Sequence, residues 1–393
     1  MTKTLPYVKI NYQNGSLGIT TPSEDGICGL IPGGAVVVGT STKQVVAGTL
    51  TAYKINSLDC VTKTGTDALT YEMIREFYAE AGDGAFLWVL GAKPTNIGTG
   101  VTDLCYAANG EIRTVAVTSP STAIDTDLKA CNDAAIDIAD KLYAPVVVIL
   151  NITVPTTIGQ AIDLTEKNYS HCAVMCGNEL TGNNATDTLL KAASSIGLLL
   201  GRIAAEPVHR SVGRVRSGAI KAVNMSFGAK EINMTTSGNV NTLNGKGYIV
   251  PRTFVGKSGF YWSDDSMACD PTDDYGLLTR RRTIDKAYRI TYQALLDEVG
   301  EEVAVSANGK MSNASVKAIQ GAVSTALENA MTAEGNLGTD PDDSGDTGVK
   351  VVIDPEQDVV ATSKVEVSVS VKPYAYSKYI EVKLGFYTST TND

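Results

Sequence analysis

A repeated alternation of apolar strands and amphipathic helices in residues 125–205 most constrains the fold of this chain. Residues 125–142 are predicted to be a helix, because one face carries Leu128, Cys131, Ala135, Ile138 and Leu142. The next segment, 146–150, is apolar at every position, and residues 172–176 are again predicted to be a buried strand. A strand that is apolar on both faces must be covered on both sides. The pattern therefore predicts an α/β region with a doubly wound sheet.

Other segments extend this region in both directions. A helix is predicted at residues 67–81, with Asp67 as its N-cap and Gly82 as its stop. Three further strands are predicted at 36–39, 86–90 and 113–118, and two further helices at 157–164 and 185–205. Towards the C-terminus, helices and strands are predicted at 275–299, 312–332, 349–353 and 364–371. The chain is therefore α/β in its centre and α+β overall.

Each end of the chain carries a strand pattern beside residues that break regular structure. Near the N-terminus, Leu5, Val8, Ile10 and Tyr12 belong to an alternating segment. Near the C-terminus, Ile380, Val382, Leu384 and Phe386 alternate with Glu381, Lys383 and Gly385. An isolated strand usually pairs with a sheet edge, which belongs either to its own chain or to a neighbouring chain.

The charge of the chain excludes several classes of function. Its 393 residues correspond to two or three domains and carry a net charge of −10. An acidic chain of this kind is expected neither to bind nucleic acid generally nor to anchor to a membrane through basic residues. No apolar run approaches the length of a membrane span, and no secretory signal is expected at the N-terminus. The weakly charged, threonine-rich surface favours packing against other protein.

Searches for catalytic and metal-binding motifs predict no chemistry. Val255-Gly256-Lys257-Ser258 lacks the first glycine of a phosphate-binding loop, because that position is Pro251, and a turn is expected there. His171, Cys172 and Cys176 are too few for a zinc site. The acidic segment with Asp340, Asp342, Asp343 and Asp346 has Val351 where a calcium loop needs glutamate. We therefore expect no catalytic residue, metal or cofactor.

One helix carries the only strong basic cluster that these patterns single out. Its members are Arg280, Arg281, Arg282, Lys286 and Arg289, and we call them the basic strip. Two interpretations stay open. The long side chains either pair with acidic residues of the same chain, or they form a cationic surface that faces another protein.

Four stretches together resemble the tail sheath proteins of contractile phage tails and contractile injection systems. They are Ile-Pro-Gly-Gly-Ala-Val-Val-Val-Gly-Thr from residue 31, the helix and strand of 73–90, residues 243–262 leading into the basic strip, and the C-terminal series of helix, acidic turn and two alternating strands. The likeness is to the sheath family of phage-like elements in Bacteroidetes-type bacteria. It spans nearly the whole chain.

The resemblance implies a structural subunit that polymerises helically around an inner tube and contracts. It implies an N-terminal arm (1–20), an outward α/β region (21–207), an assembly domain (208–375) and a C-terminal arm (376–393). The arms would exchange strands through Leu5, Val8, Ile10 and Tyr12, and through Ile380, Val382, Leu384 and Phe386. The basic strip would face the tube or stay intramolecular.

The resemblance also implies partners and a place of assembly. The partners are other copies, the inner tube, the baseplate and a terminator protein, with no nucleic acid and no membrane insertion. Assembly would take place in the bacterial cytoplasm, into a virion or a phage-tail-like particle. A doubly wound α/β enzyme and another self-assembling virion component are the alternatives.

Overall fold

The computed structural model describes residues 23–39, 45–47, 50–121, 123–153, 155, 157–179, 193–228, 230–306 and 309–386. The chain divides into two compact units, Met1–Glu301 and Glu302–Asp393. The domain limits expected at residues 20, 207 and 375 stay predictions.

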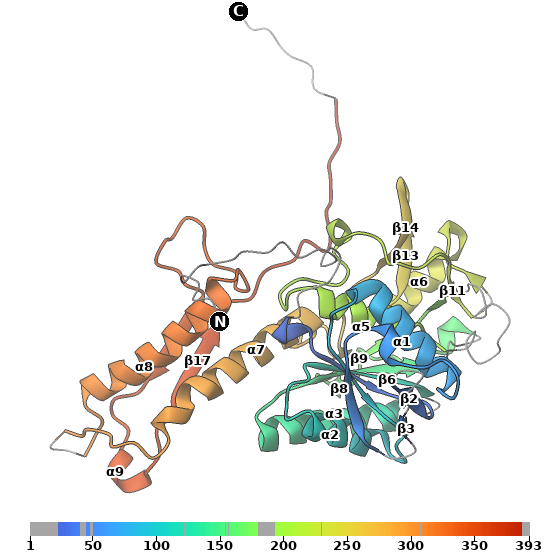
Figure 1. Cartoon of the computed structure of the whole chain (residues 1–393). Helices are drawn as coiled ribbons and strands as arrows, with labels where there is room; N and C mark the ends of the chain where they lie inside the picture. The colour runs from blue at the N-terminus through green and yellow to red at the C-terminus, as the bar shows by residue number, and fades with distance from the viewer. Residues whose placement is uncertain are drawn as a thin grey trace, which may run out of the picture. The chain divides into compact units, whose positions relative to one another are not determined.

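The first unit is built on a six-stranded sheet whose strands run in the order β4-β5-β1-β6-β7-β9. Their bounds are Ala52–Ile55, Leu87–Leu90, Cys28–Ile31, Thr114–Ser121, Val147–Ile152 and Cys172–Met175. All neighbours are parallel except the edge strand β4, which is antiparallel to β5. Helices α1 (Ala68–Ala81) and α5 (Ile196–Ala205) cover one face, and α2 (Ile97–Ala107) and α3 (Ile124–Leu142) cover the other (Figure 1). The predicted doubly wound α/β region is confirmed.

Smaller elements complete the first unit. Two-stranded antiparallel sheets pair β2 (Val36–Val38) with β3 (Val45–Ala47), β8 (Asn168–Tyr169) with β15 (Ala268–Cys269), and β13 (Pro251–Phe254) with β14 (Lys257–Trp262). A three-stranded sheet joins β10 (Asn178–Glu179), β11 (Met225–Phe227) and β12 (Lys230–Glu231). The remaining helices are α6 (Ser237–Gly245) and α7 (Leu278–Leu295).

The second unit packs one long helix against a β-hairpin. Helix α8 (Asn313–Leu327) continues into a π-helical turn at Glu328–Thr332, and its predicted stripe Val316, Ile319, Val323 and Leu327 is buried. Strand β16 (Val349–Ile353) lies against α8 and pairs with β17 (Val367–Val371), with the short helix α9 (Val359–Thr362) between them. Ile353 and Leu337 add to this core.

The structure differs from the sequence-based expectations in several helices, and the short helices α6 and α9 were not predicted. Helix α2 was not predicted, because Gly98 and Gly100 are unfavourable within a helix. The helix expected at 157–164 is only a 3-10 turn, Ile158–Gln160. Helix α5 begins at Ile196 rather than at residue 185; of the earlier residues, 193–195 are not helical and 185–192 lie outside the described residues.

Local hydrogen bonds explain the late start of α5. The Ser194 amide donates to the Asn151 side-chain oxygen at 2.9 Å, and the Ser195 amide donates to the Gly177 carbonyl at 2.8 Å. These bonds tie both residues to the carboxyl ends of β7 and β9. Their amides are therefore not available for an earlier helical turn.

Helices α1 and α5 meet closely because two glycines of α5 face the backbone of α1. A Cβ atom placed on Gly197 would lie 2.1 Å from the Met73 carbonyl oxygen, and one on Gly201 would lie 2.5 Å from the Phe77 carbonyl oxygen. A buried ion pair between Arg202 and Glu80, with a nitrogen-to-oxygen distance of 3.1 Å, lies in the same seam. The spacing of the two glycines therefore sets the separation of the helices.

Gly197→Ala tests this seam. The added methyl group has no space, so we expect the free energy of unfolding to fall by about 3 kcal/mol, the upper range for overpacking. Gly238→Ala in α6 is the matched control, because no atom lies within 4 Å of its added Cβ. It should leave stability unchanged or raise it by about 0.5–1 kcal/mol. Equal destabilisation of both variants in chemical denaturation would contradict the close packing.

Candidate assembly surfaces

Residues 379–386 of the C-terminal arm form an extended segment without a partner among the described residues. Pro373 lies against Gly338, and the Tyr374 hydroxyl donates to the Gly335 carbonyl at 3.2 Å, so the base of the arm is held. Beyond it, residues 379–386 form no hydrogen bond with any other described residue. The apolar side chains Ile380, Val382, Leu384 and Phe386 are 77% to 106% exposed. Figure 1 draws this segment as an extended trace with neither helix nor strand.

The hairpin β16–β17 has an open edge. Lys372 donates its amide to the Gly348 carbonyl directly opposite, at 2.8 Å. In an antiparallel pair the bonded positions alternate, so Val367, Val369 and Val371 turn their main-chain groups away from β16. Among the described residues no strand pairs with β17 on that side. The side chains of these three valines are half-buried, whereas Ser368 and Ser370 are exposed.

The other edge of the hairpin is partly covered. The Gln320 side chain of α8 donates to the Val351 carbonyl oxygen at 3.3 Å. The outer edge of β17 is therefore the better template for a further strand. The predicted N-terminal arm residues Leu5, Val8, Ile10 and Tyr12 lie outside the described residues.

The basic strip lies on α7, and three of its five side chains are buried within the first unit. Lys286 and Arg289 both contact the Asp25 carboxylate, at 2.8 Å and 2.7 Å. Arg282 donates to the Ile203 and Glu206 carbonyl oxygens, each at 3.1 Å, and so satisfies groups at the C-terminal end of α5. These contacts attach α7 to the α/β sheet region.

The other two members are placed differently. Arg281 pairs with Asp285 one turn along α7, and its guanidinium lies 4.9 Å from the ring centre of Tyr275. Arg280 is half-buried. Four of the five members therefore form contacts within the unit, since the Arg281 side chain is only 12% exposed and is ion-paired.

Burial and charge act in opposite directions on the anchor around Asp25. Burial raises the pKa of Asp25, but hydrogen bonding to Lys286 and the nearby guanidiniums of Arg289 and Arg282 outweigh it, so the pKa lies below its usual value. Burial lowers the pKa of Arg289 to about 10, which leaves it charged at neutral pH. The anchor is therefore an ionised cluster in a mostly dry environment.

The sequence motifs considered for chemistry are used within the fold. Val255 and Gly256 form the turn between β13 and β14, as expected. The Asp340, Asp343 and Asp346 carboxylates accept hydrogen bonds from amides of their own turn. Within the described residues, no group of His, Cys, Asp and Glu side chains is arranged to hold a metal ion. No helix in this part of the chain has the length and apolar character to cross a membrane.

At the end of the central sheet where ligands bind in many doubly wound proteins, side chains of the chain itself bond its main-chain groups. The Thr118 hydroxyl donates to the Ile31 carbonyl at 2.9 Å, and the Asn151 amide donates to the Thr118 carbonyl at 2.8 Å. Thr70 accepts a bond from the Gly33 amide at 3.0 Å, and its own hydroxyl donates to Asp67.

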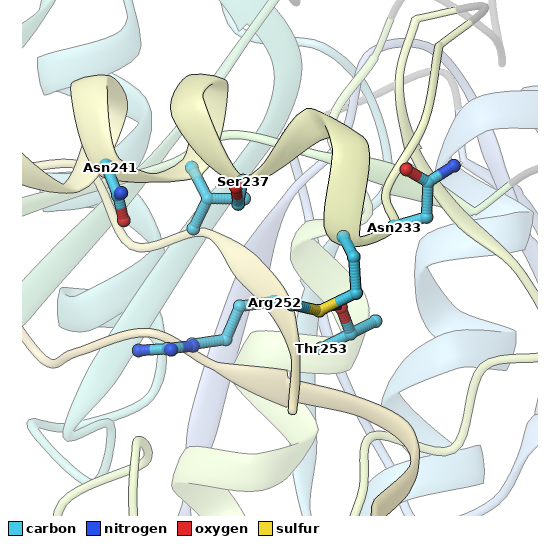
Figure 2. Close-up of a pocket in the computed structure, with 7 residues that line it drawn as sticks. Asn233, Ser237, Asn241, Arg252 and Thr253 are labelled. Carbon is cyan, nitrogen blue, oxygen red and sulfur yellow. Dashed lines mark hydrogen bonds between the residues drawn. The ribbon is translucent and has the colours of Figure 1, made fainter. Parts of the chain in front are cut away.

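One small pocket of about 70 Å³ lies between α6 and β13. Its lining residues are Asn233, Met234, Ser237, Val240, Asn241, Arg252 and Thr253. Figure 2 shows the Arg252 side chain extending along it from β13, with Ser237 and Asn241 on α6 above. This pocket was not anticipated from the sequence, because its residues belong to no known motif.

Comparison with known proteins gives matches at the level of families and of structures. The DUF2586 N-terminal domain matches residues 5–266, and the DUF2586 C-terminal domain matches residues 274–391. No curated protein is significantly similar to the chain in sequence.

Three solved structures are similar over nearly their whole length. A chain of the anti-feeding prophage (AFP) baseplate has a TM-score of 0.64 and 16% identity, covering 98% of this chain and 100% of its own. A chain of the contracted AFP helical sheath has a TM-score of 0.62 and 16% identity, covering 98% of this chain and 99% of its own. A chain of the contracted sheath of PVC, an extracellular contractile injection system, has a TM-score of 0.61 and 13% identity, covering 98% of each chain. At these identities the likeness shows that the chain has the fold of contractile sheath proteins.

Asp25→Asn tests the anchor of α7. The substitution keeps the shape of the side chain but removes the carboxylate that Lys286 and Arg289 share in a buried site, so we expect a loss of about 3 kcal/mol in unfolding free energy at neutral pH. Because the folded pKa of Asp25 is lowered, its contribution is complete above the unfolded value near 3.8 and is lost as pH falls through the folded pKa. The difference between the two proteins should therefore shrink in acid.

Asp125→Asn is the control for this experiment, because it removes an exposed carboxylate that pairs with Lys167. It should change stability little. An Asp25→Asn protein as stable as the Asp125→Asn protein at neutral pH would contradict the anchor.

Proposed function

The chain belongs to the DUF2586 family, and on that premise we propose that it is the structural subunit of a contractile sheath. It polymerises helically around an inner tube and drives the tube through a target envelope when the sheath contracts. The observation that carries the proposal is the exposed C-terminal arm beside a hairpin with an open edge. The fold shared with the AFP and PVC sheaths supports it.

Strand addition is the contact that we propose between subunits. Residues 379–386 of one copy would pair with the outer edge of β17 in another, and Ile380, Val382, Leu384 and Phe386 would continue the apolar face of its three valines. Main-chain bonds would supply affinity and the alternating side chains would supply register. The N-terminal arm, with Leu5, Val8, Ile10 and Tyr12, would extend the same mesh.

Contraction then follows from how identical subunits meet. Heterologous contacts between copies generate an open helix rather than a closed ring. Paired strands resist shear, whereas the chain beyond the held residue Tyr374 can bend as a hinge between the hairpin and residues 379–386. The free energy for contraction is stored during assembly, so no nucleotide is needed.

The partners follow from this role. They are other copies, the inner tube, the baseplate and a terminator protein, and assembly takes place in the bacterial cytoplasm into a phage-tail-like particle or virion. We propose no enzyme activity. For the basic strip, the contacts of Asp25 favour the intramolecular alternative for Lys286 and Arg289, and the bonds to the end of α5 favour it for Arg282. The ion pair with Asp285 favours it for Arg281, so Arg280 is the member for which we keep the tube-facing alternative.

Leu384→Asp combined with Phe386→Asp tests the arm. Both side chains are fully exposed in the single chain, so its unfolding free energy should not change, whereas strand addition would bury both carboxylates. We expect electron micrographs of the purified chain to show helical cylinders, and the variant to show none. The control is Glu381→Gln with Lys383→Gln, which alters the other face of the same segment and should assemble normally. Cylinders formed equally by both variants would contradict the proposal.

A further inference from the structure

One segment of the chain has a charge opposite to that of the rest. Residues 208–262 contain eight basic residues and a single acidic one, Glu231. They therefore carry a net charge of +7 within a chain of −10, and the remaining residues carry −17. A local excess of this size marks a surface for an anionic partner.

Four of the eight cations are committed to contacts inside the unit or with a neighbouring carboxylate. Lys246 donates to the Gly159 carbonyl at 2.8 Å, and Lys221 donates to the Glu80 carbonyl at 3.5 Å. Arg210 pairs with Glu206 at 3.0 Å, and Arg214 donates to the Ser217 hydroxyl at 3.3 Å. The other four have no carboxylate of a described residue within ion-pair distance; they are Arg216, Lys230, Arg252 and Lys257. We call these four the basic face.

Two members of the basic face, Arg252 and Lys257, lie on the β13–β14 hairpin, which protrudes from the first unit near α6 (Figure 1). Lys230 lies in β12, which pairs with β11, and Arg216 lies in the 3-10 turn Val215–Ser217. Arg202 fastens the start of the segment, since it donates to the Gly218 and Ala219 carbonyls at 3.2 Å and 2.9 Å. The surface is therefore held in place before a partner arrives, which lowers the entropic cost of binding.

Apolar side chains and the pocket accompany these cations. Val223 and Val255 are each 83% exposed, and Met234 is 56% exposed. In Figure 2 the Arg252 guanidinium lies on the side of the pocket near Asn241, and its Cζ lies 4.2 Å from the ring centre of Phe254. Cations mixed with exposed valine and methionine suit a protein partner better than a nucleic acid.

The chain also contains a segment of complementary charge. Residues 334–346 hold Glu334, Asp340, Asp342, Asp343 and Asp346 and no basic residue. Asp340, Asp342 and Asp343 are exposed, and amides within the turn bond to Asp340 and Asp343 and so fix its shape. The Asp342 carboxylate forms no contact with another described residue. We call residues 334–346 the acidic turn.

We propose that the basic face of one copy binds the acidic turn of a second copy, with Asp342 entering the pocket beside Arg252. Ser237 and Asn241 can donate hydrogen bonds to the same carboxylate, and Lys257 faces the adjoining Asp343. This inference rests on the proposed function, because it names a second contact between sheath subunits. It differs from strand addition in being electrostatic, and so it weakens as salt rises.

Two charge-reversed full-length proteins test this contact. One carries Arg252→Glu and Lys257→Glu, and the other carries Asp342→Lys and Asp343→Lys. Each alone should need about a tenfold higher concentration to assemble, because like charges then meet at every contact. An equimolar mixture should recover the unmodified value, because the reversed face of one protein fits the reversed turn of the other. Light scattering against protein concentration, checked by electron microscopy, measures this.

The control carries Lys129→Glu and Lys141→Glu, exposed residues of α3 whose substitution lowers the net charge by the same amount as Arg252→Glu with Lys257→Glu. It should assemble normally. Failure of the mixture to recover would overturn the proposal, and would indicate a pairing within one chain or a different anionic partner. Binding of a short fluorescent DNA duplex that Arg252→Glu with Lys257→Glu abolishes would also overturn it. If the unmodified chain forms no cylinders, the proposed function fails; if it does and the reversals have no effect, only this contact fails.

Discussion

Large apolar side chains on an extended segment are unfavourable in water, and its main-chain groups can pair only with a strand that comes from elsewhere. Residues 379–386 keep Leu384 and Phe386 almost wholly exposed, although the second unit offers an open edge at β17. The main-chain groups of Val367, Val369 and Val371 on this edge have no neighbouring strand among the described residues. A segment and an edge that each lack a partner in one chain satisfy each other between two chains.

Within the first unit, close packing and a buried ion cluster hold the helices firmly against one another. In the first unit, the glycines of α5 let it approach α1 closely, and Asp25 holds α7 through Lys286 and Arg289. Buried ion pairs of this kind add little net stability but are costly to break. Force applied to α7 would therefore be passed to the sheet region rather than absorbed by local rearrangement.

Apolar periodicity predicted much of this structure, because the doubly wound sheet, α3, α8 and the exposed alternation of the C-terminal arm all depend on local pattern. Helix α2 was missed, since its glycines are explained only by the close approach of other segments: a Cβ on Gly98 would lie 2.7 Å from the Ala130 carbonyl. The spacing of Arg282, Lys286 and Arg289 places them on one helical face, but nothing local indicates that Arg289 bonds Asp25, 264 positions away. The basic face was not predicted, because the net charge of −10 sums over the whole chain and does not reveal the local excess of basic residues in 208–262.

Hydrogen exchange of the arm amides tests the central claim most directly. In the single chain, the amides of residues 379–386 should exchange at the rate of an unstructured peptide, because none forms a hydrogen bond in the described structure. In assembled cylinders, strand addition predicts strong protection of alternate amides along this segment and new protection of Val367, Val369 and Val371. Cylinders in which the arm exchanges as fast as in the single chain would contradict the account.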